Sequence, residues 1–179
     1  MSSRTLTSAV TPEDHTQGPD DAAVTLVQYG DHECPYTRPS RHSVHKLQRE
    51  FPDELRFVYR HFPLEGIHPH ARAAATAAEA AGAQTDFWTM HEYLFEHQKR
   101  LEDADLHEYA IALGLDAVRF ERERSSPDVA RRIDRDVSSG ERSGVPGTPT
   151  FYVNGMRHHG GYDLESLRSA IVDQLGKVA

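Results

Sequence analysis

Apolar and polar residues follow patterns along this chain that change from strand-like to helical and back again. The run from Ala23 to Tyr29 is apolar and β-branched on both faces, which is typical of a strand buried between helices. A polar segment from Pro35 to Glu50 follows, in which Val44 and Leu47 form the expected inner face of a helix. Leu55–Phe62 places alternate residues on two faces and indicates a second strand. This order predicts a βαβ unit with parallel strands.

The pattern becomes helical over residues 69–142. The segment Ala71–Ala83 holds nine alanines, the best helix former, and Gly82 is placed to end that helix. Further helical segments are expected at 87–95, 106–113, 118–124 and 129–137. We interpret residues 69–142 as a compact helical insertion and not as a separate domain.

A strand pattern returns after the insertion. Residues 150–153 and 156–158 flank Asn154-Gly155, a pair that supplies the positive φ angles of a tight hairpin turn. Asp163 is then placed to cap a last helix with an apolar stripe made of Leu164, Leu167, Ile171 and Leu175. Residues 1–22 are polar and rich in Ser, Thr, Pro and Asp, so we expect a flexible leader before a single α/β domain over residues 23–179.

Composition narrows the classes of partner. The chain has 179 residues, and its 28 acidic against 20 basic residues give a formal charge of −8. Such a chain has no excess of basic residues to contact phosphates, so nucleic acid is not expected as a partner. It also lacks the apolar runs of a membrane span or a signal peptide, which predicts a cytoplasmic protein without a membrane partner. We expect a monomer.

The chain contains one cysteine, Cys34. A single thiol excludes an internal disulfide and any zinc site built on cysteine pairs. Cys34 lies between the first strand and the segment that begins at Pro35, which proline favours as a helix start. A helix N-terminus favours the thiolate and lowers the pKa of a nearby cysteine, so this position makes Cys34 a candidate nucleophile. The alternative is that Cys34 is a small buried hydrophobic residue.

Three segments carry a resemblance to a known family. They are 29–36 (YGDHECPY), 87–95 (FWTMHEYLF) and 144–151 (GVPGTPTF), the last followed by Asn154-Gly155. Together they resemble the DsbA-like branch of the thioredoxin fold, whose members are thiol–disulfide oxidoreductases with an inserted helical subdomain. The resemblance extends from about residue 11 to residue 175. It implies the fold class: an α/β thioredoxin fold with a DsbA-like helical insertion.

The resemblance also implies roles for individual residues. Cys34 matches the attacking cysteine of the family, and Pro149 matches its cis-proline. Thr148 matches the residue whose backbone pairs with a bound substrate strand. Pro35 and Tyr36 are then expected beside the substrate as well.

The chain departs from the family pattern at one position. The usual active site is Cys-Pro-x-Cys, and Thr37 stands where the second cysteine would be. A mixed disulfide on Cys34 therefore cannot be resolved by an internal thiol, so the resemblance implies a monothiol mechanism. The co-substrate would be a small thiol such as glutathione or an equivalent, and the partners would be protein disulfides or mixed disulfides. No other cofactor is expected.

Two neighbours of Cys34 allow two interpretations each. The Thr37 hydroxyl could donate a hydrogen bond to the thiolate, or Thr37 could be an ordinary residue of the first helical turn. A protonated His32 would favour the thiolate, whereas a neutral one would be a polar loop residue. The carboxylates of Asp31 and Glu33 act in the opposite direction, because negative charge disfavours a thiolate.

The twelve histidines do not indicate a metal site. The pairs His68-Pro69-His70 and His158-His159, and His91 with His97, lack the spacing and the additional ligands of common zinc motifs. We expect surface imidazoles and no bound metal.

Two classes of function follow. The first is a cytoplasmic monothiol oxidoreductase that exchanges mixed disulfides through Cys34. The second is a redox-inactive thioredoxin-fold module that binds an extended peptide beside Pro149, in the manner of a chaperone. A weaker third possibility is a glutathione-conjugating enzyme. The retained cysteine favours the first, because binding alone needs no nucleophile.

Overall fold

A computed structural model describes residues 5–178 of the chain and divides it into two compact units. The first unit comprises the chain up to Gly30, Pro35–Arg60 and the chain from Ser138 onward. The second comprises Asp31–Cys34 and His61–Val137. The second unit thus contains most of the expected helical insertion together with the four-residue segment that carries the cysteine.

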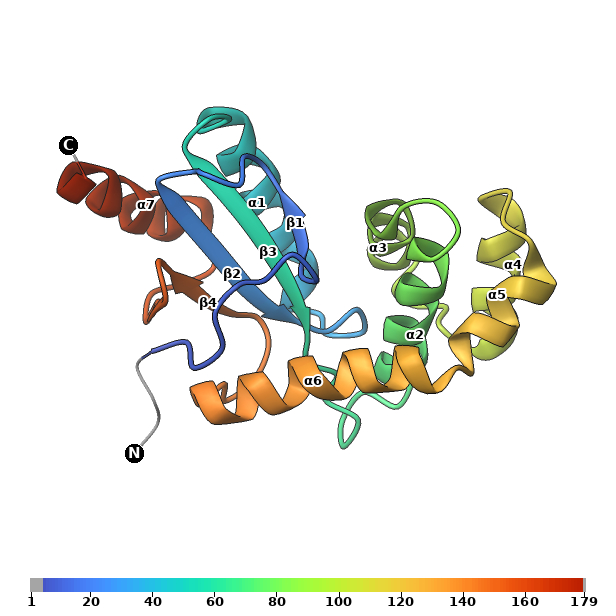
Figure 1. Ribbon diagram of the computed structural model, residues 1–179. Coiled ribbons are helices and arrows are strands. Elements are labelled where there is room, and N and C mark those ends of the chain that lie inside the picture. Colours follow the sequence, from blue (N-terminus) through green and yellow to red (C-terminus); the bar gives the residue numbers. More distant parts are fainter. Residues whose placement is uncertain (1–4, 179) are drawn as a thin grey trace. The chain divides into compact units, whose positions relative to one another are not determined.

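The strands form one five-stranded sheet in the order β1-β3-β2-β4-β5 (Figure 1). Their bounds are β1 His15–Gln17, β2 Val24–Gly30, β3 Leu55–His61, β4 Thr150–Val153 and β5 Met156–Arg157. Strands β2 and β3 are neighbours and run in the same direction in Figure 1, as the βαβ pattern predicts. β4 pairs antiparallel with β2, and β5 pairs antiparallel with β4.

The two central strands are buried on both faces. Leu26 and Val27 on β2 and Val58 and Tyr59 on β3 are all buried. The β4–β5 hairpin turns at Asn154 and Gly155, whose φ angles of 46° and 77° are the positive values that the Asn-Gly pair predicts.

Two helices of the first unit pack against each other. They are α1 (Thr37–Glu50) and α7 (Leu164–Val178). The apolar stripe of α7 is buried at Leu167 and Ile171, and the Asp163 carboxylate accepts a hydrogen bond from the backbone N–H of Ser166. α1 begins at Thr37, two residues later than the expected start at Pro35, since Pro35 and Tyr36 form a turn.

The second unit is helical. Its elements are α2 (Ala71–Gly82), α3 (Phe87–Glu96), α4 (Asp103–Ala112), α5 (Ala117–Arg124) and the first part of α6 (Pro127–Ser143). The alanine-rich α2 packs against α3, α4 and α5, because small side chains allow close approach of neighbouring helices.

Helix α6 continues beyond the expected end at residue 137 and reaches Ser143. Its last part is polar, so the apolar spacing gives no signal there. Its polar groups form buried hydrogen bonds instead: Ser139 Oγ lies 2.7 Å from the Tyr29 hydroxyl, and the Ser143 carbonyl accepts from the Tyr152 hydroxyl. Hydrogen bonds take the place of an apolar stripe.

The expectation of a flexible leader over residues 1–22 was wrong for its described part; residues 1–4 lie outside the described residues. β1 pairs antiparallel with β3, and Thr5 forms a β-bridge with Met156. The polar composition concealed this strand, because it lies at the edge of the sheet and its side chains are half-buried.

Arg60 on β3 anchors the segment before β1. Its guanidinium donates two hydrogen bonds to the Asp14 carboxylate and one each to the Ser8 carbonyl, the Ala9 carbonyl and the Tyr29 hydroxyl. All five N–H donors are therefore used. Burial lowers the pKa of Arg60, but the bond to Asp14 and the interaction with Tyr29 raise it more, so the net shift is upward.

Within the described residues, none of the helices has the length and apolar character that crossing a bilayer requires.

Candidate active site

The segment Asp31–Cys34 follows β2 directly and is fixed within the second unit by side-chain hydrogen bonds. The buried Asp31 carboxylate accepts from the backbone N–H groups of Glu33, at 2.8 Å, and of Leu64, at 3.0 Å. One of its oxygens also lies 2.7 Å from Nδ1 of His68. The Cys34 backbone N–H donates to the Asp31 carbonyl. Asp31 therefore joins the cysteine loop to the segment before α2.

Glu33 makes a second connection to that segment. Its carboxylate accepts from the backbone N–H of His70 at 2.6 Å and lies 3.0 Å from His70 Nδ1. This hydrogen bond raises the pKa of His70, and the nearby carboxylates of Glu102 and Asp103 add to the effect. Each carboxylate beside the cysteine thus has an imidazole partner, which offsets its negative charge when that imidazole is protonated.

Gln98, in the turn after α3, bonds to the cysteine loop from another side. Its amide Nε2 donates to the carbonyls of His32 and Cys34, both at 2.8 Å. Two backbone acceptors on either side of Glu33 are thereby held by one side chain. Such a clamp fixes the backbone at Cys34 more firmly than a single hydrogen bond could.

His32 is buried in an aromatic cluster of the second unit. Its Nε2 lies 3.1 Å from Nδ1 of His91, and its ring is 4.9 Å from that of Phe95. The expectation of surface imidazoles was wrong for His32, His61 and His91, which are buried. His68 and His70 are partly exposed, and each pairs with a carboxylate.

Cys34 is 2 % exposed, and its sulfur is not part of a disulfide. Thr37, at the first position of α1, is 1 % exposed, and its hydroxyl has no hydrogen-bond partner among residues 5–178. Tyr36 is 61 % exposed, and Pro35 is exposed as well. The turn that follows the cysteine therefore presents an apolar surface to solvent.

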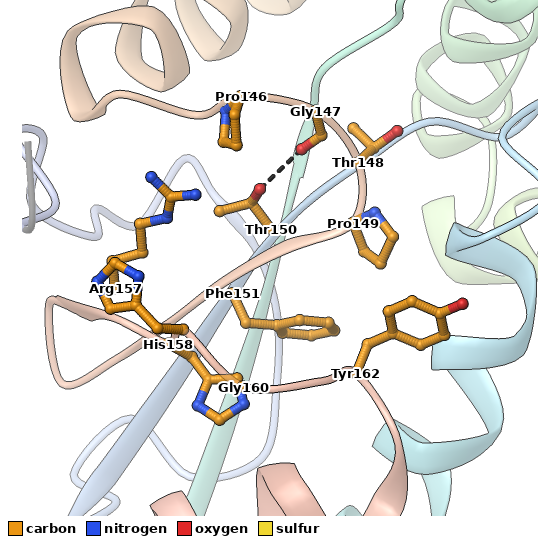
Figure 2. Close-up of a pocket in the computed structure, with 11 residues that line it drawn as sticks. Pro146, Gly147, Thr148, Pro149, Thr150, Phe151, Arg157, His158, Gly160 and Tyr162 are labelled. Atoms are coloured by element: carbon orange, nitrogen blue, oxygen red, sulfur yellow. Dashed lines mark hydrogen bonds between the residues drawn. The ribbon is translucent and has the colours of Figure 1, made fainter. Parts of the chain in front are cut away.

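The segment before β4 carries the other residues that the resemblance singles out. The Thr148–Pro149 peptide bond is cis, the geometry that the resemblance implies for this position. The Thr150 hydroxyl donates to the Gly147 carbonyl at 2.7 Å and closes the turn before the strand (Figure 2).

The expected site residues fall in both units. Cys34 and His32 belong to the second unit. Pro35, Tyr36, Thr37, Thr148 and Pro149 belong to the first. The juxtaposition of Cys34 with Pro149, and the roles of these residues, stay predictions.

Sequence reasoning missed the groups that hold the cysteine loop. His68, His70 and Gln98 lie 37 to 66 residues away in sequence from the loop residues that they contact, and no local pattern connects them. The one available signal was that two short segments carry ionisable groups of opposite kind, acidic in one and basic in the other. Asp31-x-Glu33 and His68-x-His70 each place two ionisable groups two residues apart, as a pair of matching contacts requires.

The family model described as "Thioredoxin" matches residues 10–173. The chain belongs to the thioredoxin family. Its fold is that of the DsbA-like thiol–disulfide oxidoreductases, and the recognition from the sequence motifs is confirmed.

Solved structures support this assignment. A thioredoxin-like oxidoreductase from Silicibacter pomeroyi is 28% identical, with a TM-score of 0.83, and the match covers 94% of this chain and 95% of that one. BdbD from Bacillus subtilis is 24% identical, with a TM-score of 0.79, over 90% and 92% of the two chains. Alpha-DsbA1 from Wolbachia pipientis is 18% identical, with a TM-score of 0.80, over 94% of each chain. The last two show the shared fold.

Curated relatives are longer proteins. The chain is 49% identical to part of a protein named Na(+)/H(+) antiporter NhaA 1 from Salinispora arenicola, over 88% of this chain and 24% of that protein. It is 42% identical to part of a protein of the same name from a Mycobacterium species, over 93% and 28%. The chain spans about a quarter of the length of these relatives, and the antiporter name belongs to them.

Proposed function

We propose that this protein is a monothiol thiol–disulfide oxidoreductase that forms and exchanges mixed disulfides through Cys34. The observation that carries the proposal is the retention of the attacking cysteine as the only cysteine, with Thr37 at the resolving position. Its substrates are protein disulfides or mixed disulfides, and a small thiol is the co-substrate. A reducing compartment such as the cytoplasm supplies that thiol.

The exchange takes place in two balanced steps. The Cys34 thiolate attacks one sulfur of a disulfide R–S–S–R′, so that a Cys34–S–R bond forms while the old S–S bond breaks and R′–S⁻ leaves with the bonding electron pair. A small thiolate R″–S⁻ then attacks the sulfur of R, releases R–S–S–R″ and restores the Cys34 thiolate. No electrons are gained or lost overall, so no further oxidant or reductant is needed.

The contacts of the cysteine loop support this assignment. Negative charge beside a sulfur opposes thiolate formation, but Asp31 and Glu33 each lie within hydrogen-bond distance of a histidine. Gln98 holds the carbonyl of Cys34 itself. These groups leave the nucleophile in a fixed backbone position, and the histidines, when protonated, offset the repulsion that the two carboxylates would otherwise exert.

Thr37 is the proposed partner of the thiolate. A buried hydroxyl without a hydrogen-bond partner is costly, so its retention needs a reason. We assign it the role of donating a hydrogen bond to the Cys34 thiolate once the thiol is ionised. Thr37→Val keeps the side-chain shape and removes the donor, which makes it the matched variant.

The test measures turnover of a small mixed-disulfide substrate with a reduced thiol in excess. The wild type turns over, Cys34→Ser does not, and Thr37→Val is slower by about tenfold, the value of one hydrogen bond to a charged group. Insulin reduction provides a second readout. The wild type does not reduce insulin catalytically, whereas Thr37→Cys creates a Cys-Pro-Tyr-Cys sequence and gains that activity, because resolution becomes intramolecular.

Two results would overturn the proposal. One is catalytic insulin reduction by the wild type, and the other is mixed-disulfide turnover by Cys34→Ser. A wild type that never forms a mixed disulfide would instead support the peptide-binding module.

A further inference from the structure

A pair of buried imidazoles lies in the same unit as the cysteine. Nε2 of His32 is 3.1 Å from Nδ1 of His91, which belongs to α3, and both residues are buried. His32, His91 and Cys34 all belong to the second unit, so the pair and the nucleophile are parts of one compact body. His91 has no part in the two exchange steps.

His32 and Cys34 belong to one tight turn. The Cys34 backbone N–H donates to the Asp31 carbonyl at 3.2 Å, which closes a four-residue turn with His32 at its second position. The Gln98 amide donates to the carbonyls of His32 and Cys34, both at 2.8 Å. A charge on the His32 imidazole therefore arises two residues from the nucleophile, within a turn whose backbone is fixed.

The hydrogen bond between the two rings limits how many protons they can hold. One ring nitrogen must donate while the other accepts, so either both rings are neutral or one imidazolium donates to its neutral partner. The second arrangement is charge-assisted and is the stronger hydrogen bond. A second added proton would set two N–H groups against each other and bury two positive charges. The pair is therefore a single site for one proton.

Aromatic rings surround the pair. The ring centroid of His32 lies 4.9 Å from that of Phe95, and the centroid of His91 lies 5.0 Å from Phe95, 5.4 Å from Phe87 and 5.2 Å from Trp88. Burial among these rings disfavours a charge, whereas their π faces attract a cation. The charged groups nearby decide between these opposite effects.

Two carboxylates lie behind His61, whose ring is 5.7 Å from that of His32. Glu79 on α2 is 2.8 Å from Nε2 of His61, and Asp136 on α6 accepts from the His61 backbone N–H. Two arginines of α6 oppose them, Arg132 at 3.6 Å from Glu79 and Arg135 at 3.7 Å from Asp136.

The turn itself carries two further carboxylates. Asp31 lies 2.7 Å from His68, and Glu33 lies 3.0 Å from His70. With these histidines neutral, the carboxylates around the pair exceed the arginines. This balance of charge favours a proton on the pair of His32 and His91.

We propose that His91 is a positioning residue for Cys34: it fixes the His32 ring and shares one proton with it, and the imidazolium stabilises the thiolate. The inference rests on the proposed function, because it deepens the account of the same nucleophile. His91 acts through His32. A thiolate beside an imidazolium forms at lower pH, so exchange proceeds where a free thiol would be largely protonated.

The pH dependence of Cys34 alkylation by iodoacetamide tests the pair, because alkylation measures the thiolate without requiring exchange. His32→Phe and His91→Phe each keep an aromatic ring and remove the shared proton. Each should slow alkylation about fivefold at about pH 6, and less than about twofold at about pH 9, where the thiol is largely ionised in every variant. The double variant should be no slower than either single one, since either change removes the same charge.

The matched control is His107→Phe on α4. It removes an imidazole of the same unit, one that lies 3.0 Å from the Glu121 carboxylate on α5. This variant should keep the pH profile of the wild type. A profile that moved equally in His91→Phe and His107→Phe would show a general effect of lost imidazoles and would overturn the assignment to His91.

Imidazole ¹⁵N chemical shifts provide a readout that leaves the pair unmutated. Between about pH 9 and pH 5, His32 and His91 together should take up one proton in the wild type. Cys34→Ser should lower the pH of this uptake, because coupling between two sites is reciprocal and the thiolate that favours the proton is gone. Uptake of no proton or of two, or an unchanged titration in Cys34→Ser, would overturn the proposal.

The outcomes distinguish this inference from the function on which it rests. Equal pH profiles for the wild type and His91→Phe, or effects that add in the double variant, would overturn the role of His91 and leave monothiol exchange intact. Exchange itself is measured separately, as mixed-disulfide formation with 2-hydroxyethyl disulfide. A wild type that is alkylated as expected and forms no mixed disulfide would overturn the proposed function, while the effect of the pair on the thiolate would stand.

Discussion

The two units use buried hydrogen bonds for different purposes. In the sheet unit, one arginine uses all five of its donors to hold the segment before β1 against β3. In the helical unit, side-chain hydrogen bonds hold the four-residue segment that contains Cys34. The carboxylates of Asp31 and Glu33 bond from within this segment, and the Gln98 amide bonds to it. The first network secures the edge of the fold, whereas the second fixes the position of a nucleophile. Mutations in the first network should therefore lower mainly the stability of the fold, whereas mutations in the second should lower mainly the reactivity of Cys34.

The largest effect on stability is expected for Arg60→Met. Removing the guanidinium takes the ion-pair contact with Arg60 away from the buried Asp14 carboxylate, which typically costs about 3–5 kcal/mol. Urea unfolding measures the loss of stability. The rate of thiol–disulfide exchange on Cys34, measured on the molecules that remain folded, should stay within about twofold of the wild-type rate.

The matched control for this variant is Arg56→Met on the same strand. Arg56 pairs at 3.2 Å with Asp20, which is almost fully exposed, so its loss should cost less than about 1 kcal/mol. Equal losses for the two variants would contradict the anchoring role of Arg60.

A smaller effect on stability and a larger one on exchange are expected for Gln98→Leu. Two loop carbonyls lose their donor, which should cost about 1–2 kcal/mol of folding free energy and slow mixed-disulfide formation on Cys34 by about tenfold. Gln84→Leu is the control, since the Gln84 amide also makes two backbone hydrogen bonds, donating to the Asp116 carbonyl and accepting from the Asp116 N–H, away from the cysteine loop. A similar slowing in both variants would show that lost stability, and not loop position, is responsible.

The smallest effect concerns pH and the pair of His70 with Glu33. The pKa of His70 is raised in the folded chain, so the folded state binds the proton more tightly than the unfolded state. The pair therefore stabilises the fold fully below the unfolded value of about 6.5, and this contribution is lost as the pH rises through the higher folded value.

His70→Gln tests this pair. Because the His70 side chain is 40% exposed, the variant should lose less than about 1 kcal/mol of unfolding free energy. The loss should appear only at pH values below the raised pKa that His70 has in the folded chain. Unfolding free energies measured between about pH 5 and pH 9 provide the check. A difference between wild type and variant that grows with pH would contradict the sign of this contribution.

The sequence predicted those elements whose formation depends on local residue patterns. The β-branched run of β2, the alanines of α2 and the Asn154-Gly155 turn are local signals, and each element lies where it was expected. β1 and the last part of α6 were missed, because their stability comes from backbone pairing and hydroxyl contacts instead of an apolar stripe.

The candidate site was predictable only in part. Cys34 and Pro149 stand in motifs that resemble a known family, so both could be named from the sequence. The partners of the cysteine loop could not, because His68, His70 and Gln98 reach it through tertiary contacts across long stretches of chain. Their residue types are visible in the sequence, but their pairing depends on the fold.

Intact-mass analysis tests the central claim most directly. The reduced protein is incubated with a small disulfide, quenched with acid and weighed, and then treated with the corresponding reduced thiol. The monothiol account predicts a single adduct on the wild type, no adduct on Cys34→Ser, and full reversal by the reduced thiol. An adduct that forms only after denaturation, with none on the folded wild type at any pH between about 6 and 9, would contradict it.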